Sequence, residues 1–332
     1  MNEVKDIREN FLSCVDYEKL RLKNLPNFVF LCGGTTKLVQ VKGRPDIYKS
    51  MRKAILDIIH NIPSLSNKIL LAEEYQGWLE HGVIKNLIDF ELAIADMAGA
   101  IVLILEGPGA YAELGSFSVL DTLSDKLILV INNKIIEDNS YINLGPIKYL
   151  EDNSKIVLKY SWDVKYIVRG VNLDEVDMHL TGQNADMFAK ASLIGNKIND
   201  KVKDITLTSP QLNLSRSGHV CFVIGDLIYN FGALRVHEIM SYLSDWFDIK
   251  GVTLSLVKSY LYILNEFDFI KEVDVGDKFY SPTEKNQGFI KYSYFDSLDV
   301  ETGCKSVSEI KAHMIGYYAE SDAARFEAAL GA

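Results

Sequence analysis

The chain has 332 residues, of which 48% are hydrophobic and 24% are charged, a balance typical of a globular protein with room for two domains. It contains no apolar run long enough to span a membrane, and its N-terminal segment is charged where a signal peptide would be apolar, so we expect a cytoplasmic protein without membrane association. The formal net charge of −10 argues against a protein whose main task is to wrap nucleic acid, because phosphate contacts need clustered Lys and Arg.

The first predicted elements form a strand, a glycine turn and a helix. Residues 1–26 are expected to form a helical preamble. The apolar run 28–32 predicts a buried strand, and Gly33 and Gly34 follow it directly. Pro45 suits the first turn of a helix, so the next helix is predicted to open there.

The same alternation continues through residue 159. Short apolar runs that alternate with amphipathic helices are typical of a parallel, doubly wound sheet with helices on both faces, so residues 27–165 are predicted to form a Rossmann-like α/β domain. In such sheets ligands bind at the carboxyl ends of the strands, where the loops that begin at Gly33, Glu73 and Glu106 leave the sheet. The predicted strands are 68–72, 100–105, 126–131 and 155–159, and the predicted helices are 83–97 and 111–123.

The second half of the chain has a different pattern. Residues 166–214 are expected to be a helical connector, with one or two helices over 173–203. Residues 215–300 show three helix-like stretches and then an alternating hairpin around Gly276, which is the order of a winged-helix domain. Residues 301–332 are expected to form a C-terminal helical tail.

The predicted winged-helix-like domain is acidic. Residues 215–300 contain eight Lys or Arg and twelve Asp or Glu, a balance of 8 minus 12, or −4, and the third helix carries a single lysine. Because phosphate neutralisation supplies most non-specific affinity for DNA, we do not expect this domain to bind DNA by itself. A surface that faces another protein is favoured.

The segment 106–118, EGPGAYAELGSFS, follows a buried strand and opens a helix. Backbone N–H groups of a loop around Gly107 and Gly109 would point toward a ligand at the sheet edge. Glu113, predicted in the first helical turn, could act as nucleophile at a sugar carbon that passes through an oxocarbenium-like transition state. The alternative is structural: the glutamate complements the helix dipole and the glycines make a tight turn.

Two further carboxylates lie on the helix before that strand. Glu91 and Asp96 are five residues apart and therefore on different faces of the helix. One of them can assist Glu113 while the other faces solvent. The alternative is that both carboxylates lie on a solvated helix face. The sequence has no G-x-G-x-x-G or P-loop motif, its six histidines are scattered, and its four cysteines lack zinc spacing. No metal site is expected.

Three segments in order resemble a known family. The segments that carry the resemblance are the first strand with LCGG (to Gly34), EGPGAYAELGSFS and SYINLGPIKYL. Through them the chain resembles retron effector proteins with a nucleoside deoxyribosyltransferase-like domain fused to a winged-helix-like domain. The resemblance covers about residues 28–160 and implies that Glu113 is the catalytic nucleophile, with Glu91 as its supporting acid. It implies that Asn143 lines the sugar pocket. The expected substrate-binding residues are Cys32, Gly33, Gly34, Glu73, Asp96, Glu106, Gly107, Gly109, Ser116 and Asn143.

The resemblance also implies a biological setting. Such effectors are held by a complex of the retron reverse transcriptase and its branched RNA–DNA product (msDNA), and some are similar to NAD glycohydrolases that deplete NAD during phage infection. We therefore expect a toxic antiphage effector that takes NAD as substrate and needs no cofactor, and that can form a homo-oligomer or a larger assembly with the retron complex.

One chemical argument favours NAD. Nicotinamide leaves a cationic pyridinium as a neutral molecule, so it needs no general acid, whereas purine bases usually need protonation. No histidine falls in the three motif segments, although Glu106 or Glu91 with a raised pKa could supply a proton. A nucleoside or nucleotide deoxyribosyltransferase, a phosphoribohydrolase and a non-enzymatic nucleotide sensor remain alternatives.

Overall fold

A computed structural model of the chain describes residues 6–40, 42–43, 46–66, 68–75, 87–134, 136–169, 175–180, 185–205, 210–294 and 307–331. The chain forms two compact units. We call residues 26–74 and 98–207 the sheet unit, and residues 1–25, 75–97 and 208–332 the helical unit. Among the described helices, none combines the length and the apolar character needed to cross a membrane.

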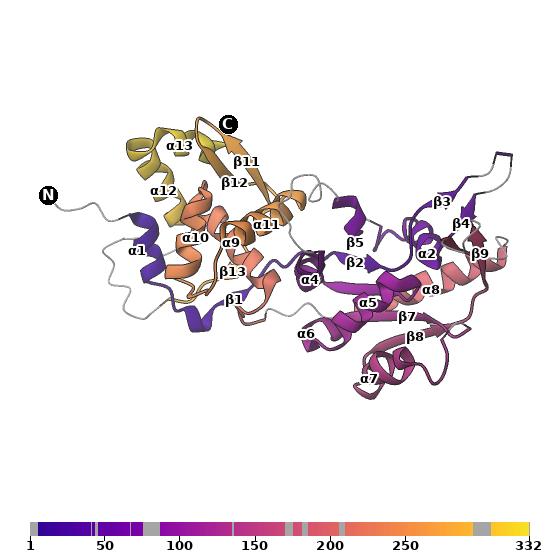
Figure 1. Cartoon of the computed structure of the whole chain (residues 1–332). Coiled ribbons are helices and arrows are strands. Elements are labelled where there is room, and N and C mark those ends of the chain that lie inside the picture. Colours follow the sequence, from indigo (N-terminus) through magenta and orange to yellow (C-terminus); the bar gives the residue numbers. More distant parts are fainter. Residues whose placement is uncertain are drawn as a thin grey trace. The chain divides into compact units, whose positions relative to one another are not determined.

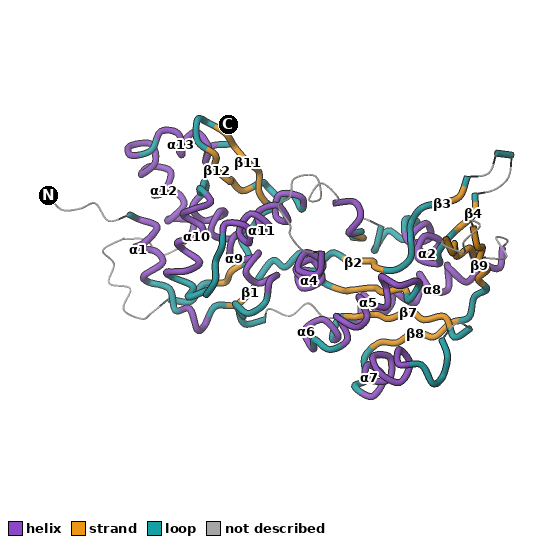
Figure 2. The backbone as a smooth tube through the Cα atoms, viewed as in Figure 1, coloured by secondary structure: helices purple, strands orange, loops and turns teal. Residues whose placement is uncertain are grey.

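The sheet unit contains the predicted parallel sheet (Figures 1 and 2). Its five strands are hydrogen-bonded in the order β5-β2-β6-β7-β8, and every neighbouring pair is parallel. The central strands consist of short apolar runs that are buried along their whole length, because helices cover a parallel sheet on both faces. The strands are β2 (Val29–Cys32), β5 (Ile69–Leu70), β6 (Ala100–Ile104), β7 (Leu127–Asn132) and β8 (Ile156–Tyr160).

The helices of this unit differ in detail from the prediction. A helix was expected from Pro45, which lies outside the described residues, but Ile47–Tyr48 forms strand β4. The helix begins only at Met51, where the Ser50 side chain accepts a hydrogen bond from the Lys53 N–H. The helices, turns and first hairpin of this unit are β3 (Leu38–Val39), β4 (Ile47–Tyr48), α2 (Met51–Ile59), a 3-10 turn (Ala72–Tyr75), α5 (Gly107–Ser118), α6 (Asp121–Ser124), a π-helical turn (Asn143–Ile147) and α7 (Lys148–Asp152).

The predicted helical connector is partly wrong. Strands β9 (Val164–Arg169), which begins just before the connector, and β10 (Glu175–Leu180) pair as an antiparallel hairpin. Helix α8 (Ala185–Asp204) then packs against α2, and its residues Ile194 and Ile198 are buried in the same core as β2, β6 and β7. Residues up to 205 therefore complete the core of the sheet unit.

Residues 217–282 of the helical unit follow the expected order of three helices and a hairpin. Helices α9 (Ser217–Phe231), α10 (Val236–Asp245) and α11 (Leu254–Glu266) precede the antiparallel pair β11 (Ile270–Asp274) and β12 (Lys278–Pro282). Segments from elsewhere in the chain join them, so the preamble and the tail are parts of this unit. These are α1 (Ile7–Ser13), a 3-10 turn (Tyr17–Lys19), β1 (Arg21–Leu22), which pairs with β13 (Ile290–Lys291), α4 (Leu87–Met97), α12 (Val307–Ser321) and α13 (Ala323–Leu330).

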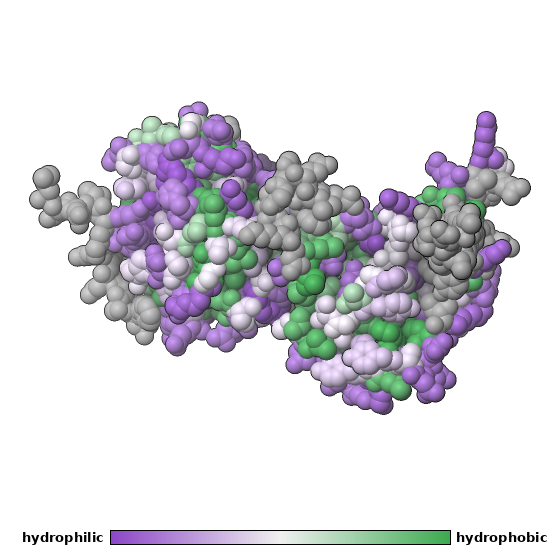
Figure 3. Space-filling model, in the orientation of Figure 1, coloured by the Kyte–Doolittle hydropathy of each residue, from purple (hydrophilic) through white to green (hydrophobic). Residues whose placement is uncertain are grey.

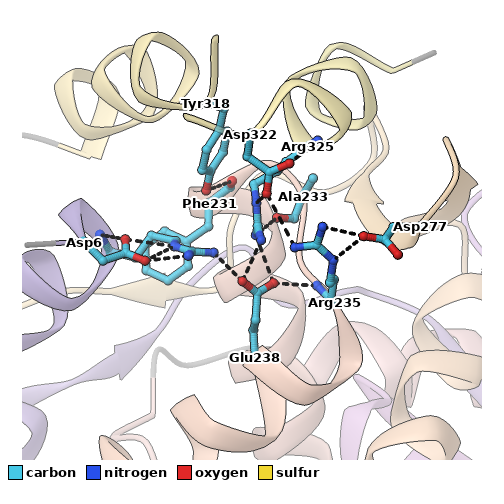
Figure 4. Close-up of polar contacts among 10 residues, drawn as sticks. Asp6, Phe231, Ala233, Arg235, Glu238, Asp277, Tyr318, Asp322 and Arg325 are labelled. Atoms are coloured by element: carbon cyan, nitrogen blue, oxygen red, sulfur yellow. Dashed lines mark hydrogen bonds and ion pairs between the residues drawn. The ribbon is translucent and has the colours of Figure 1, made fainter. Parts of the chain in front are cut away.

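A charged cluster joins the two ends of the chain to α10 (Figure 4). Glu238 accepts hydrogen bonds from Arg8 of α1 at 2.8 Å and from Arg325 of α13 at 2.6 Å and 2.9 Å. Both arginines are buried and bind a second carboxylate, Asp6 or Asp322. We call Arg8, Glu238 and Arg325 the Glu238 clasp, and it explains why segments from both termini belong to one unit.

Candidate active site

The topology of the sheet unit defines where a ligand can bind. Counted in chain order, the strand order is 2-1-3-4-5, with β2 flanked by β5 on one side and β6 on the other. In a doubly wound sheet of this order the binding crevice lies at the carboxyl ends of the two strands where the order reverses, here β2 and β6. Gly33 and Gly34 follow β2, and Glu106 follows β6, so the structure brings these three predicted residues to one edge.

Gly33 and Gly34 are required by the packing of the protein itself. Gly33 has a φ of +138°, and a Cβ there would lie 2.6 Å from the main-chain oxygen of Ile104. A Cβ on Gly34 would lie 2.7 Å from the Cβ of Ser50 and 2.9 Å from Glu106 Oε2. Only glycine lets the turn after β2 approach β6 and α2 this closely. Cys32 is the buried last residue of β2.

Glu106 is a buried carboxyl group with a raised pKa at this edge. It is 2% exposed, and its oxygens accept hydrogen bonds from the N–H groups of Met51 at 2.7 Å and Arg52 at 3.2 Å. Burial raises the pKa of Glu106 to about 7, although the two N–H groups and the charge of Arg52 act in the opposite direction. The raised pKa anticipated for a possible acid is therefore present, on a side chain enclosed by protein.

Arg52 is a site residue that the sequence analysis missed. Its guanidinium donates to the main-chain oxygens of Leu31 and Gly34 and forms a two-pronged ion pair with Glu73 at 2.8 Å and 3.0 Å. Burial raises the pKa of Glu73, but the hydrogen bonds and charge of Arg52 outweigh it, so that the pKa is lowered overall. The sequence signal for this site residue was an arginine among the apolar residues of α2. In the structure Arg52 is buried, with 5% of its surface exposed.

Glu113 lies further along α5 than predicted. The helix begins at Gly107, so Glu113 is its seventh residue, in the second turn and not the first. Its side chain is half-buried, and the Oε2 atom is buried. A Cβ added to Gly107, which has a φ of +78°, or to Gly109 would meet no atom within 4 Å, and Gly109 is exposed.

The remaining predicted residues of the sheet unit have local hydrogen bonds. Ser116 Oγ donates to the Ala112 carbonyl within α5 at 3.2 Å. Asn143 lies in the π-helical turn, where its side-chain amide donates to the Asp138 carbonyl at 3.0 Å. Substrate contacts of these two residues stay predictions.

A pocket of about 440 Å³ lies on another side of α5. Glu113 does not line it, and Gly115, which does, is about 200° away from Glu113 around the helix axis. Apolar side chains reach the surface in this region of α5 to α7 (Figure 3). The pocket is lined by Gly115, Ser118, Val119, Tyr141, Leu144, Gly145, Pro146, Lys148, Tyr149 and Asp152.

Glu91 and Asp96 lie on α4, which belongs to the helical unit. Asp96 forms an ion pair with Arg216, whose Nε atom is 2.9 Å from Oδ1, and accepts a hydrogen bond from the Gly218 N–H at 3.0 Å. Asp96 thus supplies a side-chain cap to the start of α9, for which its own N-cap residue provides none. Glu91 is half-buried, and its cooperation with Glu113 stays a prediction.

The described residues offer no ready metal site. Nowhere in this part of the chain do three or more His, Cys, Asp or Glu side chains gather in a way that could hold a metal ion. The groups that the sheet edge presents include carboxylates, backbone N–H groups at the start of α5, and the Arg52 guanidinium, which is bound by Glu73 and two carbonyl groups.

The fold and the glycine-rich start of a carboxylate-bearing helix define a class of α/β protein with a doubly wound sheet, in which ligands bind at the carboxyl ends of the strands. The family model described as STM3845 retron effector protein matches residues 48–272, more than half of the chain. The chain therefore belongs to the STM3845 retron effector family.

Two curated proteins of Escherichia coli are similar to it. "Retron Ec73 putative ribosyltransferase/DNA-binding protein" is 27% identical over 258 residues, covering 75% of this chain and 76% of that protein. "Retron Ec86 putative ribosyltransferase/DNA-binding protein" is 30% identical over 139 residues, covering 42% of each. The predicted family resemblance is confirmed.

Proposed function

We propose that this retron effector is an N-glycosidase that cleaves the bond between ribose and base in NAD or a related nucleotide, with Glu113 as nucleophile. The observation that carries the proposal is that Glu113 lies on α5, the helix that follows β6 at the carboxyl edge of the sheet, where ligands of doubly wound sheets bind. The ribosyltransferase in the names of two relatives supports chemistry at a sugar carbon.

The proposed reaction has two steps. A Glu113 oxygen forms a bond to C1′ of the ribose while the bond from C1′ to the base nitrogen breaks, and its electron pair leaves with the base. Nicotinamide departs as a neutral molecule, so this step needs no proton donor. Water then attacks C1′, the glutamate carboxylate is released, and a proton passes to solvent.

The phosphates of the substrate have a complementary partner at the start of α5. This helix is twelve residues long and its N-cap residue, Glu106, makes no side-chain capping bond to it. Pro108 has no N–H, so the donors of the first turn include those of Gly107 and Gly109, where an added Cβ would meet no atom within 4 Å, and they lie at the positive end of the helix dipole. We propose that a phosphate binds here, since this would place the ribose along α5 toward Glu113.

We further propose that the effector acts in the cytoplasm as a toxin and is restrained by the retron reverse transcriptase and its msDNA. The relatives' names include DNA binding, which supports a nucleic-acid component in the partner. The acidic balance of residues 215–300 favours contact through the protein component. A homo-oligomer or a higher assembly with the retron complex is part of the same proposal.

Transfer of the sugar to another acceptor is the second candidate function. The names of both relatives specify a ribosyltransferase, and the covalent intermediate at Glu113 could be resolved by a nucleoside base or alcohol in place of water. The sheet unit would then carry a nucleoside or nucleotide deoxyribosyltransferase activity, and the acceptor would decide the product.

The test is a substrate panel with the purified protein freed of partners. NAD, nucleotides and deoxynucleosides are each incubated with it, with and without a second base as acceptor, and the products are identified by mass spectrometry. We expect nicotinamide and ADP-ribose from NAD, formed faster than base from deoxynucleosides. Cleavage of deoxynucleosides with NAD untouched would reject the NAD assignment, and products joined to the acceptor would establish transfer.

A further inference from the structure

Glu106 connects the starts of two helices. Its main chain is the N-cap of α5, while its side chain accepts hydrogen bonds from the N–H groups of Met51 and Arg52 at the start of α2. N–H groups in the first turn of a helix have no partner within the helix, so the carboxylate satisfies two of them. The position of α5 is therefore tied to the position of α2 through one residue.

Close packing holds the Glu106 carboxylate in place. On one side lies Gly34, where even a Cβ would come within 2.9 Å of Glu106 Oε2. Gly34 is itself held, because its carbonyl accepts a hydrogen bond from Arg52 at 3.2 Å, and Ser50 Oγ donates to the nearby Thr35 carbonyl at 2.7 Å. The carboxylate is enclosed between α2 and the turn after β2.

We propose that Glu106 is a positioning residue for the reaction at Glu113, setting where α5 begins and so where the nucleophile meets the sugar. The inference rests on the proposed function of Glu113. Glu113 is seven residues further along the same helix, about 10 Å along its axis. A shift at the start of α5 therefore moves the carboxylate of Glu113 relative to the other groups at the sheet edge.

This role differs from substrate binding, which the sequence analysis assigned to Glu106. A carboxylate that binds substrate must present an oxygen to it, whereas Glu106 is 2% exposed and its two oxygens face the N–H groups of Met51 and Arg52. Its raised pKa, about 7, agrees with a carboxyl group enclosed by protein. The enclosed geometry favours positioning.

The kinetic test compares Glu106→Gln with the matched control Glu74→Gln, which removes a carboxylate from an exposed residue of the same unit. The Gln amide presents a donor where the carboxylate accepts, so one N–H of α2 loses its partner. For nicotinamide release from NAD we expect kcat of Glu106→Gln to fall about tenfold or more with KM within about twofold, because a small misplacement of a catalytic group is costly. A raised KM with unchanged kcat, or no change, would overturn the proposal.

Hydrogen–deuterium exchange gives a readout that needs no activity. We expect Glu106→Gln to increase amide exchange in peptides covering both 51–59 and 107–118, with Glu74→Gln unchanged. Gly34→Ala, whose Cβ would lie 2.7 Å from the Ser50 Cβ and 2.9 Å from Glu106 Oε2, serves if Glu106→Gln does not fold. Only its increase over 107–118 is then read as an effect of Glu106, because the contact with Ser50, the N-cap of α2, disturbs 51–59 directly. An increase confined to 51–59 would contradict the link to α5. If the wild type cleaves no nucleotide, the proposed function fails, while this exchange result still decides whether Glu106 positions α5.

Discussion

At the scale of single residues, Asp96 joins the start of α9 to α4. Its ion pair with Arg216 and its bond to the Gly218 N–H are both inside the helical unit. We expect Asp96→Ala to lower the free energy of unfolding by about 3 kcal/mol, because it leaves a half-buried arginine and a helix start without their partner. Chemical denaturation measures this, with the exposed Asp89→Ala on the same helix as control. Unchanged stability together with a raised KM would support the predicted substrate contact instead.

Glu106 gives a pH-dependent prediction. Because burial raises its pKa from 4.5 to about 7, the folded protein holds this proton more tightly than the unfolded chain. The contribution of Glu106 to stability is therefore full below about pH 4.5 and is lost as the pH rises to about 7. We expect wild type to lose on the order of 2 to 3 kcal/mol relative to Glu106→Gln across this range. Denaturant unfolding of both proteins at several pH values measures this. A difference in the free energy of unfolding between wild type and Glu106→Gln that stays constant with pH would contradict the raised pKa of Glu106.

At the scale of elements, the Glu238 clasp fastens α1 and α13 to α10. Burial raises the pKa of Glu238, but hydrogen bonds and charges from Arg325, Arg235 and Arg8 outweigh it and hold the pKa at about 2. Its stabilisation is therefore present above about pH 4.5 and is lost as the pH falls toward 2.

The clasp can be tested by removing its central charge. Glu238→Gln should cost about 3 kcal/mol near pH 7, because two buried arginines lose a shared carboxylate, and the cost should shrink in acid. Urea unfolding at several pH values measures both effects, with Glu266→Gln, an exposed glutamate at the end of α11, as control. Equal stability of Glu238→Gln and the control at pH 7 would show that the clasp does not fasten the ends of the chain.

At the scale of the whole molecule, the parallel sheet was predictable because its buried strands consist of short apolar runs between helices. The hairpin of β9 and β10 was not predicted, because its residues carry charges that fit an exposed helix equally well. The placement of α4 in the helical unit depends on contacts such as Asp96 with Arg216, 120 residues apart. Local patterns do not contain such pairings, so the sequence predicted the helix that carries Glu113 but not the contacts of Arg52 and Asp96.

The charge of the whole protein predicts weak binding to free DNA. Its net charge is −10, and α11, the third helix of the predicted winged-helix order, carries only Lys258 as a cation. We expect the full chain to bind duplex DNA no more tightly than about 10⁻⁶ M at physiological salt. Fluorescence anisotropy over a range of salt concentrations measures this. Nanomolar affinity of the full chain for duplex DNA, with a steep salt dependence, would contradict this prediction and show that the protein itself has a DNA-binding surface.

The most direct measurement of the central claim is the initial rate of nicotinamide release from NAD by Glu113→Gln beside wild type and Glu74→Gln. Glutamine keeps the size of the side chain but removes the nucleophile, so we expect a loss on the order of 10³-fold or more with a near-normal melting temperature. If Glu113 only complemented the helix dipole, the change would cost at most about 1 kcal/mol of stability and leave the rate intact. A folded Glu113→Gln protein that released nicotinamide at the wild-type rate would contradict the account, and Glu91 would become the next candidate nucleophile.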